Sequence, residues 1–132
     1  MTKEIMKRFT EWANLKIKIH LSPEISFFFH QREIWWASIG QNVGSEQGGK
    51  NRNFERPVLI IKKFNSRTFL GAPISTQLKI SPYHHTFIQS DKKYCTNVSQ
   101  IRTFSSKRLL RLVGKMSSED FQEVTNKLQK LG

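Results

Sequence analysis

The chain has 132 residues, of which 37% are hydrophobic, so it is long and apolar enough for one folded domain with a single modest core. Its net charge of +12 is unevenly placed, because residues 50–115 hold 14 basic residues against only Glu55 and Asp91. Such a regional excess attracts polyanions, so nucleic acid or an acidic protein tail is a better expectation than a basic face that serves solubility alone.

Cysteine usage and hydropathy narrow the class of protein further. The single cysteine, Cys95, excludes an intramolecular disulfide and a zinc site built from clustered cysteines, and it fits a reducing, cytoplasmic location. The first thirty residues mix Lys with Glu and lack the apolar centre of a signal peptide, and no apolar run approaches a membrane span. We therefore expect a cytoplasmic protein with no metal, cofactor or membrane partner.

The N-terminal part predicts a helical arm. Apolar side chains recur at helical spacing from Ile5 to Ala13, which favours an amphipathic helix over residues 3–18 with Thr2 as its cap. Pro23 breaks this pattern, and residues 25–29 fit either a short strand or an apolar linker. We assign residues 1–31 to this arm, packed on a main domain of residues 32–132.

The sequence of the main domain predicts five strands, at residues 32–39, 57–63, 67–76, 84–90 and 95–103. A polar, glycine-bearing loop over residues 40–55 follows the first strand. Turns are expected at Asn65 and Ser66 and at residues 90–93. Together these elements indicate a mainly β fold with helices, in the form of a strongly bent antiparallel sheet or small barrel.

Two helices are expected after the strands. Four apolar residues between Ser105 and Val113 favour a short helix there. Ser117 and Asp120 fit a capping box at the start of a closing helix. Its apolar stripe would consist of Phe121, Val124, Leu128 and Leu131.

Polar residues gather where these strands begin and end. Residues 44–48 read Gly-Ser-Glu-Gln-Gly, Arg56 opens an apolar strand, and the strand that follows ends at Ser75 and Thr76. This order brings an arginine, two hydroxyls and the Glu46 carboxylate to the rim of one small β structure. Such a set can hold a phosphate, since the arginine fork donates two hydrogen bonds and stays charged.

Several separate blocks of the sequence, in order, resemble the MazF/PemK/Kid family of toxin endoribonucleases. They lie at residues 32–37, 44–48, 56–60, 73–77, 99–103 and 107–109, so the resemblance covers roughly residues 32–131. It implies an SH3-like, CcdB-like barrel of about five to seven antiparallel strands with a C-terminal helix. It also implies a homodimer that cleaves single-stranded RNA without a metal, through attack by the 2′-hydroxyl, and a cognate antitoxin with an acidic tail.

The resemblance also implies roles for individual residues. Arg56 would stabilise the phosphate, and the family credits this arginine with proton transfer. Ser75 stands where the family usually carries a catalytic threonine, with Thr76 as the alternate, because adjacent strand residues face opposite sides. Glu46 would act as base or orient Arg56, and Gln47 would contact a base edge or the RNA backbone. Without this context, residues 45–47 would be read as a turn bonded to its own backbone.

Other residues have competing interpretations. Contacts with RNA are expected from Gln77, Lys79, Arg102 and, in the loop, Lys50 and Arg52, although each charge could also be solvated surface. His84 and His85 suggest an acid–base pair, but we prefer that one faces in and the other out of a strand. Trp35 and Trp36 also face opposite sides; one is expected in the core, and the other serves either packing or base stacking.

Two departures from the family leave alternatives open. The loop of residues 49–55 is longer than usual, and the N-terminal arm has no counterpart in the minimal family domain. A non-catalytic RNA-binding protein of the same fold is therefore one alternative. A CcdB-like gyrase inhibitor is a weaker one, since the resemblance lies in the nuclease loop rather than in the C-terminal helix.

Overall fold

A computed structural model describes residues 28–39 and 54–131 of the chain. The predicted arm helix and most of the predicted polar loop lie outside these residues. The described elements, in chain order, are β1 (Glu33–Ser38), β2 (Glu55–Lys63), β3 (Thr68–Ser75), β4 (His84–Gln89), β5 (Lys92–Asn97), the 3-10 turn η1 (Val98–Gln100), β6 (Arg102–Ser105), the 3-10 turn η2 (Ser106–Arg108), β7 (Leu109–Lys115) and α2 (Ser118–Gln129).

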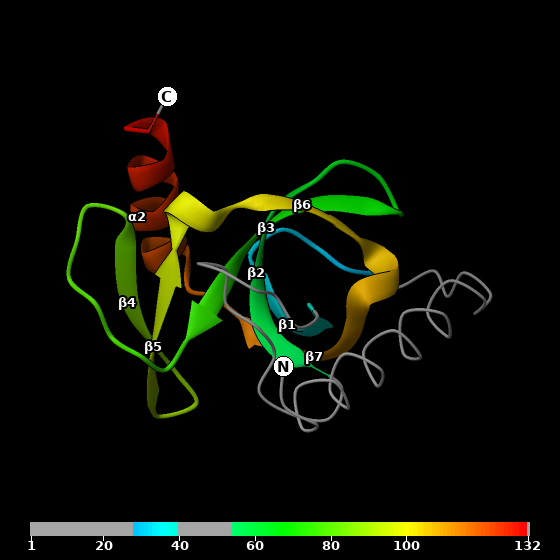
Figure 1. The fold of residues 1–132 in the computed structure, drawn as a ribbon, viewed down its shortest axis with the longest axis horizontal. Coiled ribbons are helices and arrows are strands. Elements are labelled where there is room, and N and C mark those ends of the chain that lie inside the picture. The colour runs from blue at the N-terminus through cyan, green and yellow to red at the C-terminus, as the bar shows by residue number, and fades with distance from the viewer. Residues whose placement is uncertain (1–27, 40–53, 132) are drawn as a thin grey trace, which may run out of the picture.

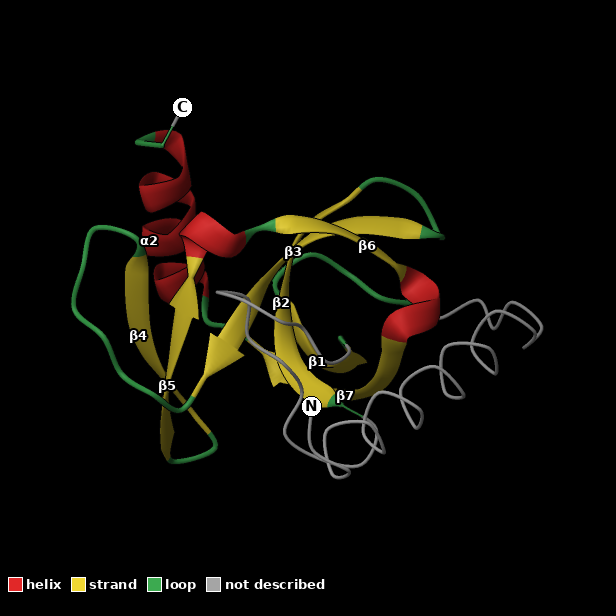
Figure 2. Cartoon of the chain, viewed as in Figure 1, coloured by secondary structure: helices red, strands yellow, loops and turns green. Residues whose placement is uncertain are grey.

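The strands form one curled antiparallel sheet with the order β4-β5-β3-β2-β1-β7, and β6 pairs with the first half of β3. β4, β5 and α2 lie at one side of the molecule, while β6 and β7 curl around the other side (Figures 1 and 2). This arrangement confirms the predicted class, a mainly β barrel-like sheet with a C-terminal helix. Among the described residues, no helix is long and apolar enough to cross a membrane.

β2 is the centre of the sheet and is apolar on both faces. Val58 and Ile60 face a core inside the curl, formed with Trp35, Phe69, Phe104 and Leu109 among others. Leu59 and Ile61 face a second core on the outer side, which contains Ile34, Ile74, Phe87 and Val124. Because side chains alternate along a strand, one buried strand serves both cores. The β4–β5 hairpin and α2 cover the outer face.

The structure contradicts the prediction of a helix over residues 105–113. Only Ser106–Arg108 form a helical turn, η2. Leu109–Lys115 instead form the strand β7, which pairs antiparallel with β1. Apolar residues at 109, 110, 112 and 113 suit a short helix and a short strand equally well. The unpaired edge of β1 decides the outcome, since a strand there satisfies its backbone groups.

The strand predicted over residues 95–103 was also wrong in extent, because it is divided by η1. The Asn97 side-chain oxygen accepts hydrogen bonds from the Ser99 backbone nitrogen at 3.0 Å and the Ser99 hydroxyl at 2.6 Å. These local bonds cap the turn and end β5. β6 then resumes beside β3.

The turn between β4 and β5 is two residues long rather than the four predicted. Gln89 pairs with Lys92, and Ser90 and Asp91 between them have φ angles of 52° and 64°. Two positive φ values are typical of the tight hairpin turn that matches strand twist. Lys92 and Lys93 therefore belong to β5.

The predicted cap of the last helix is confirmed. Ser117 precedes α2, and its hydroxyl oxygen accepts a hydrogen bond from the Asp120 backbone nitrogen at 3.1 Å. Val124 is buried in the outer core, and Phe121 and Leu128 are partly buried against it. Leu131, at the end of the predicted stripe, is exposed.

Replacement of Gly71 in β3 by Ala should destabilise the protein. A β-carbon at this position would lie 2.7 Å from Val58 Cγ1 and 2.9 Å from Phe69 Cε2, inside the packed inner core. Overpacking of this kind costs about 1–3 kcal/mol. Urea unfolding followed by tryptophan fluorescence measures the loss. Ser118→Ala, at an exposed helical position, is the control, and equal unfolding midpoints for the two variants would contradict the expectation.

Candidate active-site pocket

Arg56 and Ser75 come together through the pairing of β2 with β3. Val58 pairs with Pro73 in this ladder. Arg56 and Ser75 lie two residues beyond this pair, at the start of β2 and the end of β3. The strand pairing thus brings the start of β2, with Arg56, to the same region as the end of β3, with Ser75.

Both residues line a pocket with a volume of about 170 Å³. Its other lining residues are Trp36, Glu55, Pro57, Ile74, Thr76, Lys92 and Tyr94. Arg56 is only 7% exposed. Burial lowers the pKa of its guanidinium below the ordinary value, because the charged form loses hydration there.

The two predicted hydroxyls differ in their settings. Ser75 is buried, and its hydroxyl oxygen accepts a hydrogen bond from the Gln77 backbone nitrogen at 3.0 Å. This bond fixes the oxygen and leaves the hydroxyl proton to be donated to a ligand. Thr76 lines the same pocket but is exposed.

The carboxylate beside Arg56 is held by another arginine. Glu55 is 4% exposed, and its Oε2 lies 2.7 Å from Nη2 of Arg111 on β7. The close Glu55 carboxylate raises the pKa of Arg111, because it favours the charged guanidinium. The Arg111 guanidinium also lies 5.0 Å from the centre of the Trp36 ring, a cation–π contact. Arg111 therefore links the start of β2 to the aromatic wall of the pocket.

Lys92 and Tyr94 are among the pocket residues that the sequence did not predict. Both come from β5, which reaches the pocket because β5 pairs with the end of β3 at Ser75. A turn predicted over residues 90–93 hid their alternation. The available signal was the pair Ser90 and Asp91, since a two-residue hairpin turn places Lys92 and Tyr94 on one face of a strand.

The remaining predicted site residues fall into two groups. Glu46, Gln47, Lys50 and Arg52 lie outside the described residues. Gln77 and Lys79 are exposed in the segment after β3, and Arg102 is exposed on β6, with its guanidinium 4.7 Å from the centre of the Phe104 ring. These three do not line the pocket, and their contact with RNA stays a prediction.

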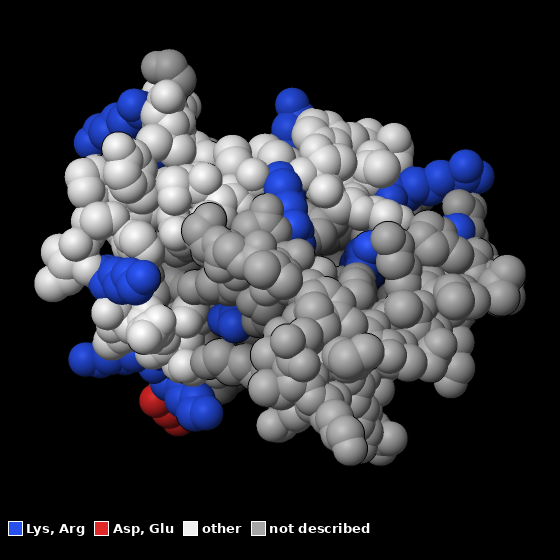
Figure 3. Space-filling model, viewed as in Figure 1, with Lys and Arg blue, Asp and Glu red and all other residues white. Residues whose placement is uncertain are grey.

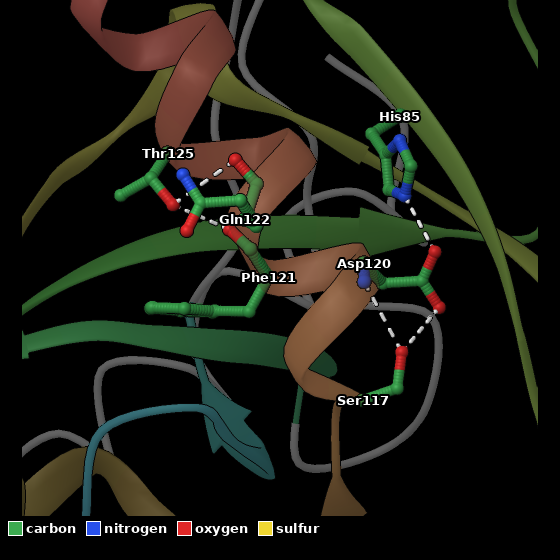
Figure 4. A network of polar contacts seen from close by, with 6 residues as sticks. All are labelled: His85, Ser117, Asp120, Phe121, Gln122 and Thr125. Carbon is green, nitrogen blue, oxygen red and sulfur yellow. Dashed lines mark hydrogen bonds and ion pairs between the residues drawn. The ribbon is translucent and has the colours of Figure 1, made fainter.

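The two histidines bind different partners. His85 Nε2 lies 2.8 Å from Asp120 Oδ1 on α2, and the same carboxylate accepts a hydrogen bond from the Ser117 hydroxyl (Figure 4). His84 Nδ1 lies 2.5 Å from the Ser81 hydroxyl oxygen. Burial, with the charges of Lys79 and Lys127, lowers the pKa of His84. Neither histidine lines the pocket, so their described roles are in packing α2 and the segment before β4.

The two tryptophans divide as expected from their alternation. Trp35 belongs to the inner core, whereas Trp36 lines the pocket. On the face shown in Figure 3, basic side chains are spread over the described surface and acidic ones appear at one place. In residues 28–39 and 54–131, no three metal-ligating side chains come together in a group that could hold an ion.

Comparison with known proteins identifies the family. The family model described as PemK-like, MazF-like toxin of type II toxin-antitoxin system matches residues 30–132. The chain belongs to this family. Among the curated proteins compared, none matches its sequence.

Solved structures of the same fold agree with the assignment to the PemK/MazF family. MazF from Deinococcus radiodurans is 18% identical, with a TM-score of 0.66, and the match covers 80% of this chain and 96% of that one. The MazE-MazF structure from the same organism gives 14% identity and a TM-score of 0.64, over 80% and 95% of the two chains. A mycobacterial endoribonuclease in complex with its cognate antitoxin is 14% identical, with a TM-score of 0.60, and the match covers 76% of this chain and 90% of that one.

The contact between Arg111 and Glu55 predicts a stability effect at the pocket. Arg111→Ala should lower the urea midpoint, because a buried carboxylate loses a charged partner. Lys115→Ala, at an exposed position of the same strand, is the control. The two variants and the parent protein are compared by urea unfolding. An Arg111→Ala midpoint equal to that of Lys115→Ala would show that this ion pair is not needed to hold Glu55.

Proposed function

We propose that this PemK/MazF-family protein is a metal-independent, sequence-selective endoribonuclease that cleaves single-stranded RNA, including mRNA, as the toxin of a type II toxin–antitoxin system. The observation that carries the proposal is the pocket that both Arg56, from β2, and Ser75, from β3, line. A buried guanidinium beside a fixed hydroxyl suits a phosphodiester better than a neutral ligand.

The reaction would use the nucleophile that RNA itself carries. The 2′-hydroxyl loses its proton and its oxygen attacks the adjacent phosphorus, while the bond from phosphorus to the 5′-oxygen breaks and that oxygen takes a proton. The products are a 2′,3′-cyclic phosphate and a 5′-hydroxyl. Charge builds on the phosphate oxygens during attack, so donors already held in place there accelerate the reaction most.

Arg56 and Ser75 fit the task of stabilising this charge. The Arg56 fork donates hydrogen bonds to two phosphate oxygens. The Ser75 hydroxyl donates a further hydrogen bond to the phosphate, while its own oxygen accepts one from the Gln77 backbone nitrogen. Lys92 adds a second positive charge at the same pocket. Burial strengthens these interactions, because fewer waters compete for the donors.

Proton transfer is assigned to Glu46 and Arg56. Glu46 is the proposed base for the 2′-hydroxyl, or orients Arg56 for that task. The pKa of Arg56, lowered by burial, favours its exchange of protons relative to an exposed arginine. Glu55 is assigned a positioning role instead, since its carboxylate forms an ion pair with Arg111.

The proposed partners follow from the charge and the family. The basic surface attracts RNA, and it would also attract the acidic tail of a cognate antitoxin. Solved relatives include a mycobacterial endoribonuclease bound to its cognate antitoxin and a MazE-MazF structure. We propose that this protein likewise binds an antitoxin and acts in the cytoplasm as a homodimer.

Loss of the Arg56 guanidinium should abolish cleavage. Arg56→Ala should cut a long single-stranded RNA at least about 100-fold more slowly than the parent protein, because one preorganised donor to the developing charge is removed. The assay contains EDTA, and end-group analysis of the products looks for 2′,3′-cyclic phosphates.

Lys63→Ala, an exposed cation at the far end of β2, is the matched control and should cut normally. Undiminished cutting by folded Arg56→Ala would contradict the role of this residue. Binding of RNA by the parent protein at several salt concentrations without any cleavage would instead support the non-catalytic alternative.

The two neighbouring hydroxyls should behave differently. Ser75→Ala should slow cleavage by about tenfold or more, since a donor to the phosphate is lost, whereas Ser75→Thr keeps the hydroxyl and should retain activity. Thr76→Ala should change the rate by less than about threefold, because Thr76 is exposed and none of the described residues fixes its oxygen. Single-turnover rates on one RNA measure this order, and a larger loss for Thr76→Ala would reverse the assignment.

A further inference from the structure

We propose that a second hollow beside the pocket is a subsite for a nucleobase, and that Gln89 reads the edge of that base. The inference rests on the proposed function, because it places the base next to the phosphate held by Arg56 and Ser75. It adds a residue that determines which RNA sequences are cut.

The second hollow adjoins the first and is mainly apolar. It has a volume of about 70 Å³ and shares Trp36, Pro57, Ile74 and Tyr94 with the pocket that holds Arg56. Phe87 and Gln89 complete it, with two further aliphatic side chains. Since four residues line both hollows, a nucleotide with its phosphate in the first can extend its base toward the second.

The aromatic walls of this hollow are held in place. The ring of Tyr94 stacks on that of Phe87, with centroids 5.9 Å apart and planes 27° from parallel. The Trp36 ring is held by the guanidinium of Arg111 at 5.0 Å. Rings fixed in this way give a base a surface for stacking at little cost in side-chain entropy.

Gln89 brings an amide to this apolar hollow. Its Nε2 lies so close to the backbone of Gly114 that a β-carbon there would be 2.4 Å away. The absence of a side chain at Gly114 therefore makes room for the amide. Gln89 lines this hollow and is partly buried, and within residues 28–39 and 54–131 no hydrogen bond of its side-chain amide is found.

An amide in this position can discriminate between bases. It offers one donor and one acceptor side by side, which match a base edge that presents the complementary pair. A base with the wrong pattern would leave the amide unpaired among apolar groups, which is costly. Trp36 and Tyr94 would accept any base by stacking, so the choice among bases falls to Gln89.

The first test measures binding without cleavage. Two series of deoxydinucleotides, varied in the base 5′ or 3′ of the phosphate, lack the 2′-hydroxyl and cannot be cut by the proposed reaction. They are titrated into the full-length protein while the side-chain amide resonance of Gln89 is followed by NMR. We expect one base in one series to shift this resonance and to bind about tenfold more tightly than the weakest. No shift with any dinucleotide would overturn the subsite.

The second test measures selectivity in cleavage. An RNA library randomised on both sides of the cut is treated with the parent protein and with Gln89→Leu and Gly114→Ala, the latter displacing the amide without removing it. Both variants should reduce the preference for the favoured base from about tenfold to below about threefold. Gln129→Leu, the same change at an exposed helical position, should keep it.

The outcomes separate this inference from the proposed function. Unchanged preference at both positions in Gln89→Leu would overturn the role of Gln89. If the parent protein cuts no RNA but one dinucleotide shifts the Gln89 resonance, the nuclease proposal fails and the subsite stands.

Discussion

The structure depends on how the start of β2 accommodates charge. β2 is buried on both faces between its neighbours, yet its first two residues are Glu55 and Arg56. A buried charge is tolerated only with partners. Arg111 supplies one for Glu55 from β7, the edge strand on the other side of β1. Arg56, held at the same strand entrance, keeps its charge at the mouth of a pocket. The strand that builds both cores thereby also contributes a guanidinium to the lining of the pocket.

The part of the fold set by local pattern was predictable. β1 and β2 follow from dense apolar runs bounded by turn residues, and α2 follows from Ser117 and its apolar stripe. The segment of residues 105–113 was not predictable, because its apolar residues fit the spacing of a helix as well as that of a strand. Its structure depends on the free edge of β1, a feature of the assembled sheet and not of the segment.

The candidate site was predictable in its strand residues and not in its walls. Arg56 and Ser75 occur in sequence blocks whose order resembles the family, and both line the pocket from the adjacent strands β2 and β3. Lys92 and Tyr94 carry no motif, and they reach the pocket only because the short hairpin of β4 and β5 folds against the end of β3. A turn mistaken by two residues was enough to conceal them.

Because the two hollows share a wall, holding a phosphate and reading a base would not be independent. A base seated between Trp36 and Tyr94 would exclude water from the pocket that contains Arg56. Removing water lowers the local dielectric and strengthens the attraction between the guanidinium and the charge that develops on phosphate. A base rejected by Gln89 would leave the pocket hydrated and Arg56 less effective. Selectivity would then appear in the rate of the chemical step as well as in affinity, since the same side chains both recognise the base and dehydrate the phosphate site.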